Sequence, residues 1–457
     1  MELRVREVVE ATRGELLQGD PEEVVHGVWT DSRTLPPGVL FFALKGSRFD
    51  GHDFAAEAVR KGAKALVIHR DVELEEGVAL IKTEDTLRAL GDLARWWRSG
   101  MKGEVIGITG SCGKTTTKEM VARILQQRGT VASSPGNYNN LIGLPLSLLR
   151  APREVRAMVL EMGMSRPGEI ARLSRIARPT VGVITNVGPV HLEGLSSLEA
   201  VRDAKGELLE GMADAATLVY NADDPLVAEI ASRYRGRKLP FGREKGVVRA
   251  LKVAESDSGL DLEVLTPKGE LSVELKILGD GAVYAALAAT ATALAAGASP
   301  SEVREGLRDF EPLEGRMKFH KVGPFTVIDD SYNSNPLAVQ AALKVLGSRQ
   351  GGRKIAVLGD MAELGRDAPR FHREVGKLCA DLGLDALFLL GPLAQEIASG
   401  AKEGRLRGEV YIGSDHGDIA KALKGFLRAG DWVLIKGSRV MEMERVLDAL
   451  RKGEEER

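Results

Sequence analysis

Short apolar runs alternate with amphipathic stretches along most of the chain. The runs lie at residues 39–44, 65–68, 105–109, 157–160, 181–185, 325–328, 354–358, 386–390 and 432–435. Their Val, Ile, Leu and Ala content is typical of buried strands. Stretches with helical spacing lie between many of them, for example at residues 54–61 and 115–127. Because strands that alternate with helices pair in parallel and carry the helices on their faces, the pattern predicts an α/β protein.

Two regions differ from this pattern. Residues 247–277 contain short runs that alternate between apolar and polar positions, which predicts an antiparallel appendage. Residues 282–296 are mostly alanine and predict a packed helix. Linker-like segments with turn-forming residues, at residues 99–103 and 312–315, separate the units in which strands and helices alternate. We therefore predict three α/β domains, at residues 1–100, 101–313 and 314–457.

Composition narrows the class of protein. Of the 457 residues, 44% are apolar and 28% are charged, so each domain can bury a core and the chain is not disordered. The 63 basic and 65 acidic residues nearly balance, which argues against a general binder of nucleic acid or of anionic membranes. Cys112 and Cys379 match no metal or disulfide motif. With neither a secretory signal nor a membrane-spanning stretch in the sequence, we expect a cytoplasmic protein without membrane insertion.

A glycine-containing loop follows the apolar run at residues 105–109. Residues 107–117 read Gly-Ile-Thr-Gly-Ser-Cys-Gly-Lys-Thr-Thr-Thr. Glycines in such a loop let main-chain N–H groups converge on phosphate oxygens at a helix N-terminus. The lysine neutralises phosphate charge and the threonine hydroxyl ligates Mg²⁺. The loop therefore predicts a site for a triphosphate and Mg²⁺ formed by Gly110, Ser111, Cys112, Gly113, Lys114, Thr115 and Thr116.

The same loop carries a resemblance to a known family. Residues 109–116 resemble the ATP loop of the Mur ligases, the ATP-dependent amide ligases of peptidoglycan synthesis, and folylpolyglutamate synthase has a similar loop. Residues 137–145, Asn-Tyr-Asn-Asn-Leu-Ile-Gly-Leu-Pro, are similar to the segment that follows the loop helix in the family member that adds D-alanyl-D-alanine. The resemblance implies that Asn140 binds the nucleotide. Residues 160–165 are similar to the segment whose glutamate, here Glu161, binds magnesium.

Further segments extend the resemblance. Residues 186–193, with Lys205 fourteen positions after His191, match a family pattern of Asn, then His, then Lys. In relatives the matching lysine is carbamylated by CO₂ and helps to hold a second Mg²⁺. Arg316 resembles the arginine that reaches ATP phosphate. The resemblance implies a catalytic set of Lys114, Glu161, His191, Lys205 and Arg316, and a metal site of Thr115, Glu161, His191 and Lys205.

Segments near both ends of the chain match in the same way. Residues 328–336 resemble the ATP-ribose segment, which implies nucleotide contacts from Asp330, Asn333 and Asn335 as well as from Arg316. Residues 358–365 and 435–439 resemble segments of the dipeptide-adding member, and the implied dipeptide-binding residues are Asp360, Met361, Glu363 and Leu364. Three segments within residues 30–54 match the UDP-sugar-binding region. The residues implied there are Ser32, Arg33, Lys45, Gly46, Asp50, Gly51 and His52.

The resemblance implies a division of labour among the three domains. The small α/β N-terminal domain would bind the UDP-substrate, and the central phosphate-loop ATPase-type domain, with its parallel sheet, would bind ATP. The Rossmann-like C-terminal domain would lie on the ribose and dipeptide side. The implied enzyme is a monomer that joins UDP-N-acetylmuramoyl-tripeptide to D-alanyl-D-alanine with ATP and Mg²⁺, through an acyl phosphate.

Three questions stay open in the sequence. Residues 279–285 lack the histidine and asparagines through which the family normally contacts adenine. The third residue of the tripeptide, meso-diaminopimelate or lysine, is not decided. The third question is the function itself. Its alternatives are another Mur-type or folylpolyglutamate-type amide ligase, and a nucleotide-binding relative without catalysis.

Overall fold

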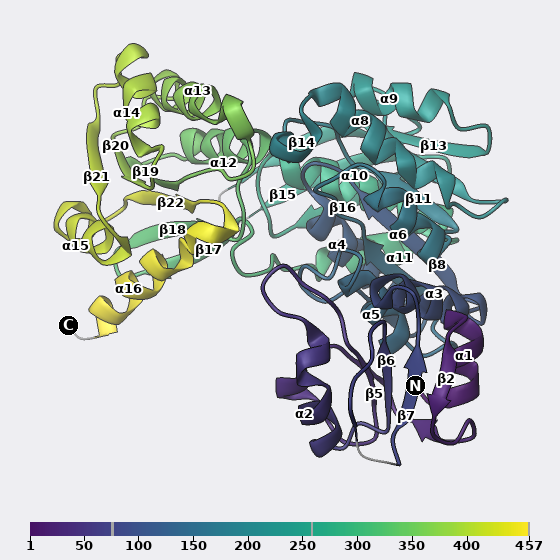
Figure 1. Ribbon diagram of the computed structural model, residues 1–457. Helices are drawn as coiled ribbons and strands as arrows, with labels where there is room; N and C mark the ends of the chain where they lie inside the picture. The colour runs from purple at the N-terminus through teal and green to yellow at the C-terminus, as the bar shows by residue number, and fades with distance from the viewer. Residues whose placement is uncertain (75–76, 257–258, 456–457) are drawn as a thin grey trace.

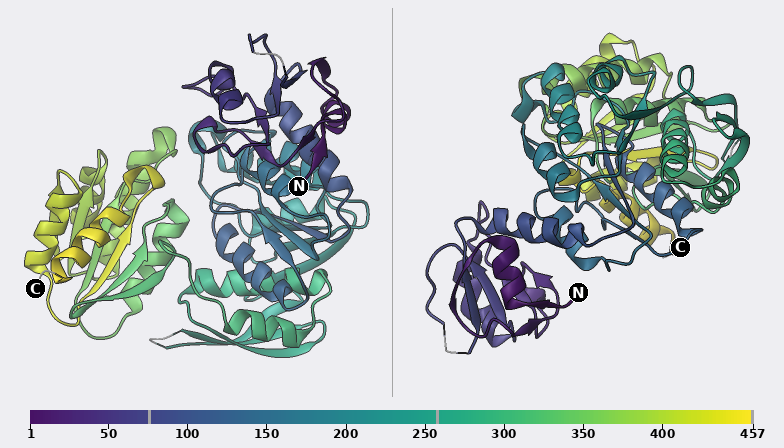
Figure 2. Two further views of the ribbon diagram at one scale, coloured as in Figure 1. Left: turned by 90° about the horizontal axis from the view of Figure 1, so that it is seen from below. Right: turned by 90° about the vertical axis from the view of Figure 1, so that its right-hand side faces the viewer.

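The computed structural model describes residues 1–74, 77–256 and 259–455, and these form three lobes, each with its own sheet (Figure 1). The last two residues of the predicted C-terminal domain lie outside the described residues. The N-terminal and C-terminal lobes lie on different sides of the central lobe (Figure 2). The predicted α/β class is confirmed. No helix within the described ranges is long and apolar enough to cross a membrane.

The N-terminal lobe contains a mostly parallel sheet. Its strand order is β2 (Glu15–Gln18), β7 (Ala79–Lys82), β6 (Ala65–Ile68), β5 (Leu40–Phe42) and β4 (Val28–Trp29), with β2 antiparallel to β7. The other elements are β1 (Leu3–Arg4), α1 (Val5–Thr12), β3 (Val24–Val25), α2 (Ala55–Arg60), α3 (Thr86–Ser99) and the 3₁₀ turns η1 (Ser32–Thr34) and η2 (Gly51–Phe54). The apolar runs predicted at 39–44 and 65–68 form β5 and β6, which are buried because helices cover both faces of the sheet.

Helix α3 joins the N-terminal and central lobes. It contacts α5 (Gly143–Arg150) and α6 (Glu169–Ala177) of the central lobe. The Trp97 indole N–H donates to the Ala151 carbonyl at 3.0 Å, and Arg98 Nε donates to the Ala177 carbonyl at 2.8 Å. The boundary predicted at residue 100 therefore falls directly after a helix whose side chains are buried against both lobes.

The central lobe is built on a nine-stranded sheet. Its strand order is β16 (Gly269–Leu275), β15 (Leu260–Thr266), β14 (Val248–Glu255), β13 (Arg237–Gly242), β12 (Thr217–Asn221), β11 (Val181–Ile184), β8 (Glu104–Thr109), β10 (Ala157–Glu161) and β9 (Val131–Ser133). From β9 to β14 the pairs are parallel, and β14, β15 and β16 pair antiparallel. The strands predicted within 247–277 therefore extend the central sheet instead of forming a separate appendage.

Helices cover both faces of this sheet. One face packs against α4 (Lys114–Gln126), α10 (Asp280–Ala295) and α11 (Pro300–Arg308). The other face packs against α5, α6, α8 (Leu198–Gly206) and α9 (Pro225–Ser232), with α7 (Leu192–Leu195) and η3 (Glu207–Glu210) beside them. Alternate side chains of β8 serve the two cores, since Ile106 and Ile108 join the first and Val105 joins the second. The alanine-rich helix predicted at 282–296 is α10, and its small residues let it lie close to α4.

The C-terminal lobe has a six-stranded sheet. Its strand order is β17 (Lys318–Val322), β18 (Phe325–Asp330), β22 (Trp432–Lys436), β19 (Lys354–Gly359), β20 (Ala386–Leu390) and β21 (Glu409–Gly413), with only β17 antiparallel to its neighbour. The helices are α12 (Pro336–Ser348), α13 (Ala368–Asp381), α14 (Ala394–Glu403), α15 (His416–Phe426) and α16 (Glu444–Glu455), with 3₁₀ turns η4 (Gly365–Asp367) and η5 (Arg439–Met441). The loops after β18 and β22 face the loops after β8 and β10 of the central sheet.

Candidate active site

A cavity of about 690 Å³ lies between the central and C-terminal lobes. The carboxyl ends of parallel strands from both sheets surround it, the place where α/β proteins bind ligands. The predicted site residues that line it are Ser111, Cys112, Gly113, Lys114, Thr115, Thr116, Asn140, Glu161, His191, Arg316, Asp330, Asn333, Asn335 and Glu363. Segments far apart in the sequence thus meet at one site.

The phosphate loop is held in shape by its glycines and by one asparagine. Gly110 and Gly113 have positive φ angles of 150° and 79°, and a Cβ on Gly110 would lie 1.9 Å from the Thr185 hydroxyl. Asn186 Oδ1 accepts the N–H groups of Ser111 and Cys112, at 3.0 and 2.8 Å. The loop is therefore fixed before any ligand binds, and α4 begins at Lys114 with its N-terminus toward the cavity.

Glu161 lies beside the first turn of α4. The Thr115 hydroxyl donates to Glu161 Oε2 at 2.7 Å, and Asn139 Nδ2 donates to Oε1 at 2.9 Å. Burial alone would raise the pKa of Glu161, but the Lys114 charge and these two hydrogen bonds, with Arg316, hold it below its usual value. A hydroxyl and an ionised carboxylate at one point are the oxygen donors that Mg²⁺ prefers, so the residues fit that cation.

The segment at 137–140 also contains a residue that sequence reasoning missed. Asn140, predicted to bind the nucleotide, lines the cavity while its Oδ1 accepts the N–H groups of Ile142 and Gly143. Its neighbour Asn139 is the residue that contacts Glu161. The run of asparagines was visible in the sequence, but the turn that sets the direction of each asparagine side chain was not.

Lys205 lies buried on α8, with 2% of its surface exposed. Within the described chain its side-chain amine has no hydrogen-bond or ion-pair partner. Burial lowers the pKa of Lys205 well below that of an ordinary lysine, and the nearby Lys114 charge lowers it further. Lys205 does not line the cavity itself.

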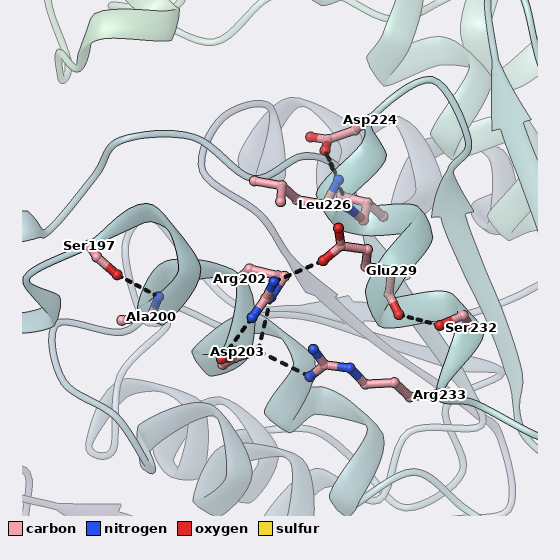
Figure 3. A network of polar contacts seen from close by, with 10 residues as sticks. Ser197, Ala200, Arg202, Asp203, Asp224, Leu226, Glu229, Ser232 and Arg233 are labelled. Carbon is pink, nitrogen blue, oxygen red and sulfur yellow. Dashed lines mark hydrogen bonds and ion pairs between the residues drawn. The ribbon is translucent and has the colours of Figure 1, made fainter.

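Ion pairs connect α8, the helix that carries Lys205, to α9 and the residue after it. Arg202 donates to Asp203 at 3.0 Å and to Glu229 at 2.8 Å, and Arg233 donates to Asp203 at 3.0 Å (Figure 3). Asp224 caps α9 with one carboxylate oxygen and accepts the Val187 N–H with the other, at 2.8 Å. One helix, α9, therefore ties together α8 and the segment that leads to His191.

His191 connects the two lobes at the rim of the cavity. Its Nδ1 hydrogen-bonds Glu363 of the C-terminal lobe, and both residues have positive φ angles, 52° and 62°. The Glu193 N–H donates to the Glu363 carbonyl at 3.3 Å. The hydrogen bond to His191 holds the pKa of Glu363 below its usual value. The predicted metal and dipeptide residues thus contact each other here.

The C-terminal wall of the cavity contains two further cations. The Arg316 guanidinium lies over the Tyr332 ring, 4.1 Å from its centre. Lys436, which was not predicted as a site residue, is buried and donates to Asp330 Oδ2 at 2.5 Å and to the Asn333 carbonyl at 2.9 Å. Burial raises the pKa of Asp330, and the Lys436 charge opposes that rise. The sequence signal for Lys436 was its place in the 435–439 segment.

Three of the predicted dipeptide residues lie behind the cavity wall. Asp360, Met361 and Leu364 are not among the lining residues. Asp360 accepts the Leu393 N–H with both carboxylate oxygens, at 3.2 Å, and the Met361 N–H donates to His372 Nε2 at 3.0 Å. These side chains and main-chain groups hold the loop after β19, while Glu363 from the same loop lines the cavity.

The predicted UDP-binding residues lie in the N-terminal lobe, away from this cavity. Among the described residues, none before Ser111 lines the cavity. Arg33 pairs with Asp31 and is largely exposed. His52 is buried: its Nδ1 contacts Asp50 at 2.6 Å and its Nε2 accepts the His69 N–H at 3.0 Å. An isolated bridge pairs Lys45 with Asp50. The structure brings these residues together in one region of the lobe without joining them to the cavity.

Comparisons with known proteins match nearly the whole chain. Family models match residues 24–98 (Mur ligase family, catalytic domain), 108–293 (Mur ligase middle domain) and 315–439 (Mur ligase, glutamate ligase domain). A relative from Bacillus subtilis (strain 168), named UDP-N-acetylmuramoyl-tripeptide--D-alanyl-D-alanine ligase, is 36% identical over 452 residues, 98% of each chain.

Solved structures agree. MurF from Acinetobacter baumannii is 31% identical, with a TM-score of 0.93 over 99% of both chains. The MurF ligase from Thermotoga maritima in complex with ADP is 32% identical, with a TM-score of 0.86 over 94% of this chain and 98% of that chain. The predicted three-lobe architecture is confirmed, and the chain belongs to the Mur ligase family.

Proposed function

We propose that this protein is an ATP-dependent ligase that joins UDP-N-acetylmuramoyl-tripeptide to D-alanyl-D-alanine in peptidoglycan precursor synthesis. The relatives named for this reaction cover nearly the whole chain. The observation that carries the proposal is the cavity in which a phosphate loop, the Thr115–Glu161 contact and the cations Arg316 and Lys436 face one another. That arrangement suits a reaction in which negative charge moves between oxygens.

The chemistry requires two displacements. A carboxylate oxygen of the tripeptide attacks the γ-phosphorus of ATP, and ADP leaves with the electrons of the broken bond. The dipeptide amine then attacks the acyl carbon, loses a proton, and phosphate leaves. Neither displacement needs a side-chain nucleophile. The protein contributes by positioning the reactants and by neutralising charge.

Two cations are suited to the phosphate charge. Lys114 lies at the N-terminus of α4, and its Nζ donates to the Gly110 carbonyl at 2.8 Å, so a phosphate oxygen can replace that carbonyl. Arg316 reaches the cavity from the opposite lobe, where stacking on Tyr332 orients its guanidinium. The two charges approach the nucleotide from different lobes, so bound ATP would hold the lobes together.

Thr115 and Glu161 would hold Mg²⁺, which neutralises phosphate charge when bound. His191 is suited to the same site through Nε2, since its Nδ1 is engaged by Glu363. Asp330, Asn333 and Asn335 are proposed to bind the ribose side of ATP, and Asn140 the nucleotide. Ser111, Cys112, Gly113 and Thr116 complete the phosphate loop around it.

Lys205 is proposed to act as a carbamate. Its side chain is buried, has no hydrogen-bond or ion-pair partner in the described chain, and interacts electrostatically with Lys114 and Cys112 of the phosphate loop. An ammonium group there would oppose Mg²⁺. A neutral amine can attack CO₂, releasing a proton and forming an anion whose oxygens suit the cation. The lowered pKa of Lys205 favours that neutral amine.

The remaining residues complete the proposal. Ser32, Arg33, Lys45, Gly46, Asp50, Gly51 and His52 are proposed for the UDP-substrate, and Asp360, Met361, Glu363 and Leu364 for the dipeptide. Domain limits at 1–100, 101–313 and 314–457 stay predictions. So do the monomeric state, the lack of nucleic-acid binding and the cytoplasmic location.

The decisive experiment measures phosphate release and UDP-pentapeptide with the tripeptide nucleotide, ATP and Mg²⁺, with and without D-alanyl-D-alanine. We expect product only when both substrates are present. Turnover with a different amino-acid acceptor would identify another ligase of the family. ATP binding without any amide product would identify a relative that lacks catalysis.

A further inference from the structure

The cavity has two chemically different ends. One end holds the phosphate loop and the charged groups described above. The other end is a slot between α12 and the segment at 277–282 that leads into α10. Ile277, Leu278 and Ala282 line one wall, and Ala338, Ala341 and Val345 line the other. Among the described residues, no lining residue of either wall carries a polar side chain.

Helix α12 runs from the phosphate end to the slot. Its N-cap Asn335 accepts from the Cys112 thiol of the phosphate loop, at 3.1 Å. At about 1.5 Å of rise per residue, Val345 lies roughly 15 Å along the helix from Asn335, comparable with the length of a nucleoside triphosphate. The walls meet near Val345, because a Cβ on Gly279 would lie 2.3 Å from its Cγ2. The slot therefore lies within reach of the base of a nucleotide whose phosphates occupy the loop.

We propose, building on the ATP-dependent function above, that the slot binds the purine by shape and apolar contact and does not read its 6-position. The enzyme therefore also uses ITP, which has an oxygen where ATP has the 6-amino group, with a kcat/KM within about 200-fold of that for ATP. Selectivity among purine nucleotides is low in this enzyme, and the walls of the slot set it.

Nearby polar side chains are engaged elsewhere. Asp280, at the start of α10, pairs with Arg243, and the Tyr284 hydroxyl donates to Asp223 at 3.0 Å. The Gly279 carbonyl accepts the Ala282 N–H at 2.9 Å. An apolar pocket discriminates between near-isosteres by only ~10–200-fold, whereas a site built to hydrogen-bond a polar group rejects its analogue by ~10⁴–10⁵.

The test compares kcat/KM for ATP and ITP in the complete reaction, together with the affinities of ADP and IDP by calorimetry. We expect ATP to be preferred by less than about 200-fold in both measurements. A larger preference would overturn the proposal, because polar groups would then be reading the base. Loss of turnover with every nucleotide would count against the proposed function, while the ADP and IDP affinities would still decide base selectivity.

Gly281 offers a matched pair of variants. It lines the slot, and a Cβ there meets no atom within 4 Å, so a side chain fits without displacing the fold. Gly281→Asn places an amide at the slot and is expected to change the ratio of ADP to IDP affinity by up to about tenfold, the effect of a net hydrogen bond. Gly281→Ala adds the Cβ without the amide and is expected to leave the ratio unchanged. Equal ratios in the two variants would show that the base does not bind in this slot.

Discussion

The cavity and the N-terminal lobe both gather charged residues from matched family segments, but they hold them differently. In the cavity, Lys114 and Glu161 are held by partners on the protein side while they line an open space. In the N-terminal lobe, Asp50 and His52 satisfy each other, and His52 is buried. A matched segment can therefore contain residues that face an open space and residues whose polar groups are already paired within the protein.

In the cavity, the largest effect is expected from removing the positive charge of the phosphate loop. Lys114→Ala should lower kcat/KM by about 10²–10³-fold, the range for deleting one group that stabilises developing charge. The thermal unfolding temperature should stay unchanged, because the side chain makes one hydrogen bond within its own loop. Lys102→Ala, which removes an exposed lysine, is the control. Turnover near that of the unmodified protein would contradict the phosphate-loop assignment.

A variant of Lys205 tests whether the functional site includes a buried residue that does not line the cavity. Lys205→Ala should lower turnover on the order of 100-fold, and acetate or formate should restore part of it by supplying the missing carboxylate. With ¹³C-labelled bicarbonate, NMR should show a carbamate signal in the unmodified protein and none in the variant. Full activity in the variant would rule out an essential role. Lost activity without rescue, and with no carbamate signal, would leave Lys205 a structural residue.

The sequence predicted most of the fold but only part of the site, for a physical reason. Strands such as β8 and β11 follow from apolar runs, and the phosphate loop follows from its glycines, because these are local signals. The Asp330–Lys436 pair joins residues more than 100 positions apart, and the choice between Asn139 and Asn140 depends on one turn. The place of β14–β16 at the edge of the central sheet also depends on long-range pairing, which periodicity does not specify.

In the N-terminal lobe, a variant of Asp50 tests whether the paired residues there stabilise the fold. Burial alone would raise its pKa, but hydrogen bonds from the His52 main chain and ring and from Arg70, with the charge of His52, lower it to about 2. Asp50→Ala should therefore reduce the free energy of unfolding by ~1–2 kcal/mol at neutral pH, as for loss of a capping carboxylate. Because the folded pKa lies below the ordinary 3.8, this contribution is complete above pH 4 and disappears as pH falls toward 2.

Denaturant unfolding of the protein and the variant across that pH range measures the effect. Asp53→Ala, which removes a more exposed neighbour paired with the same Arg70, is the matched control. A raised KM for the UDP-substrate in Asp50→Ala would support the proposed contact of Asp50 with that substrate. Unchanged stability across the pH range would contradict the stabilising role of the Asp50–His52 contact.

The smallest effect is expected at Cys112. A variant there tests whether this cavity residue has a packing role or a chemical one. Its thiol donates to Asn335 across the two lobes, and burial raises the pKa of the thiol, so the thiolate is disfavoured. Cys112→Ser keeps a donor of similar size at that contact. We expect kcat and the KM for ATP to change by less than about threefold, within the range of substitutions that remove no packing or charge. Complete loss of turnover with unchanged ATP affinity would instead mean that sulfur takes part in a covalent step, and the cavity would then hold a nucleophile as well as its cations.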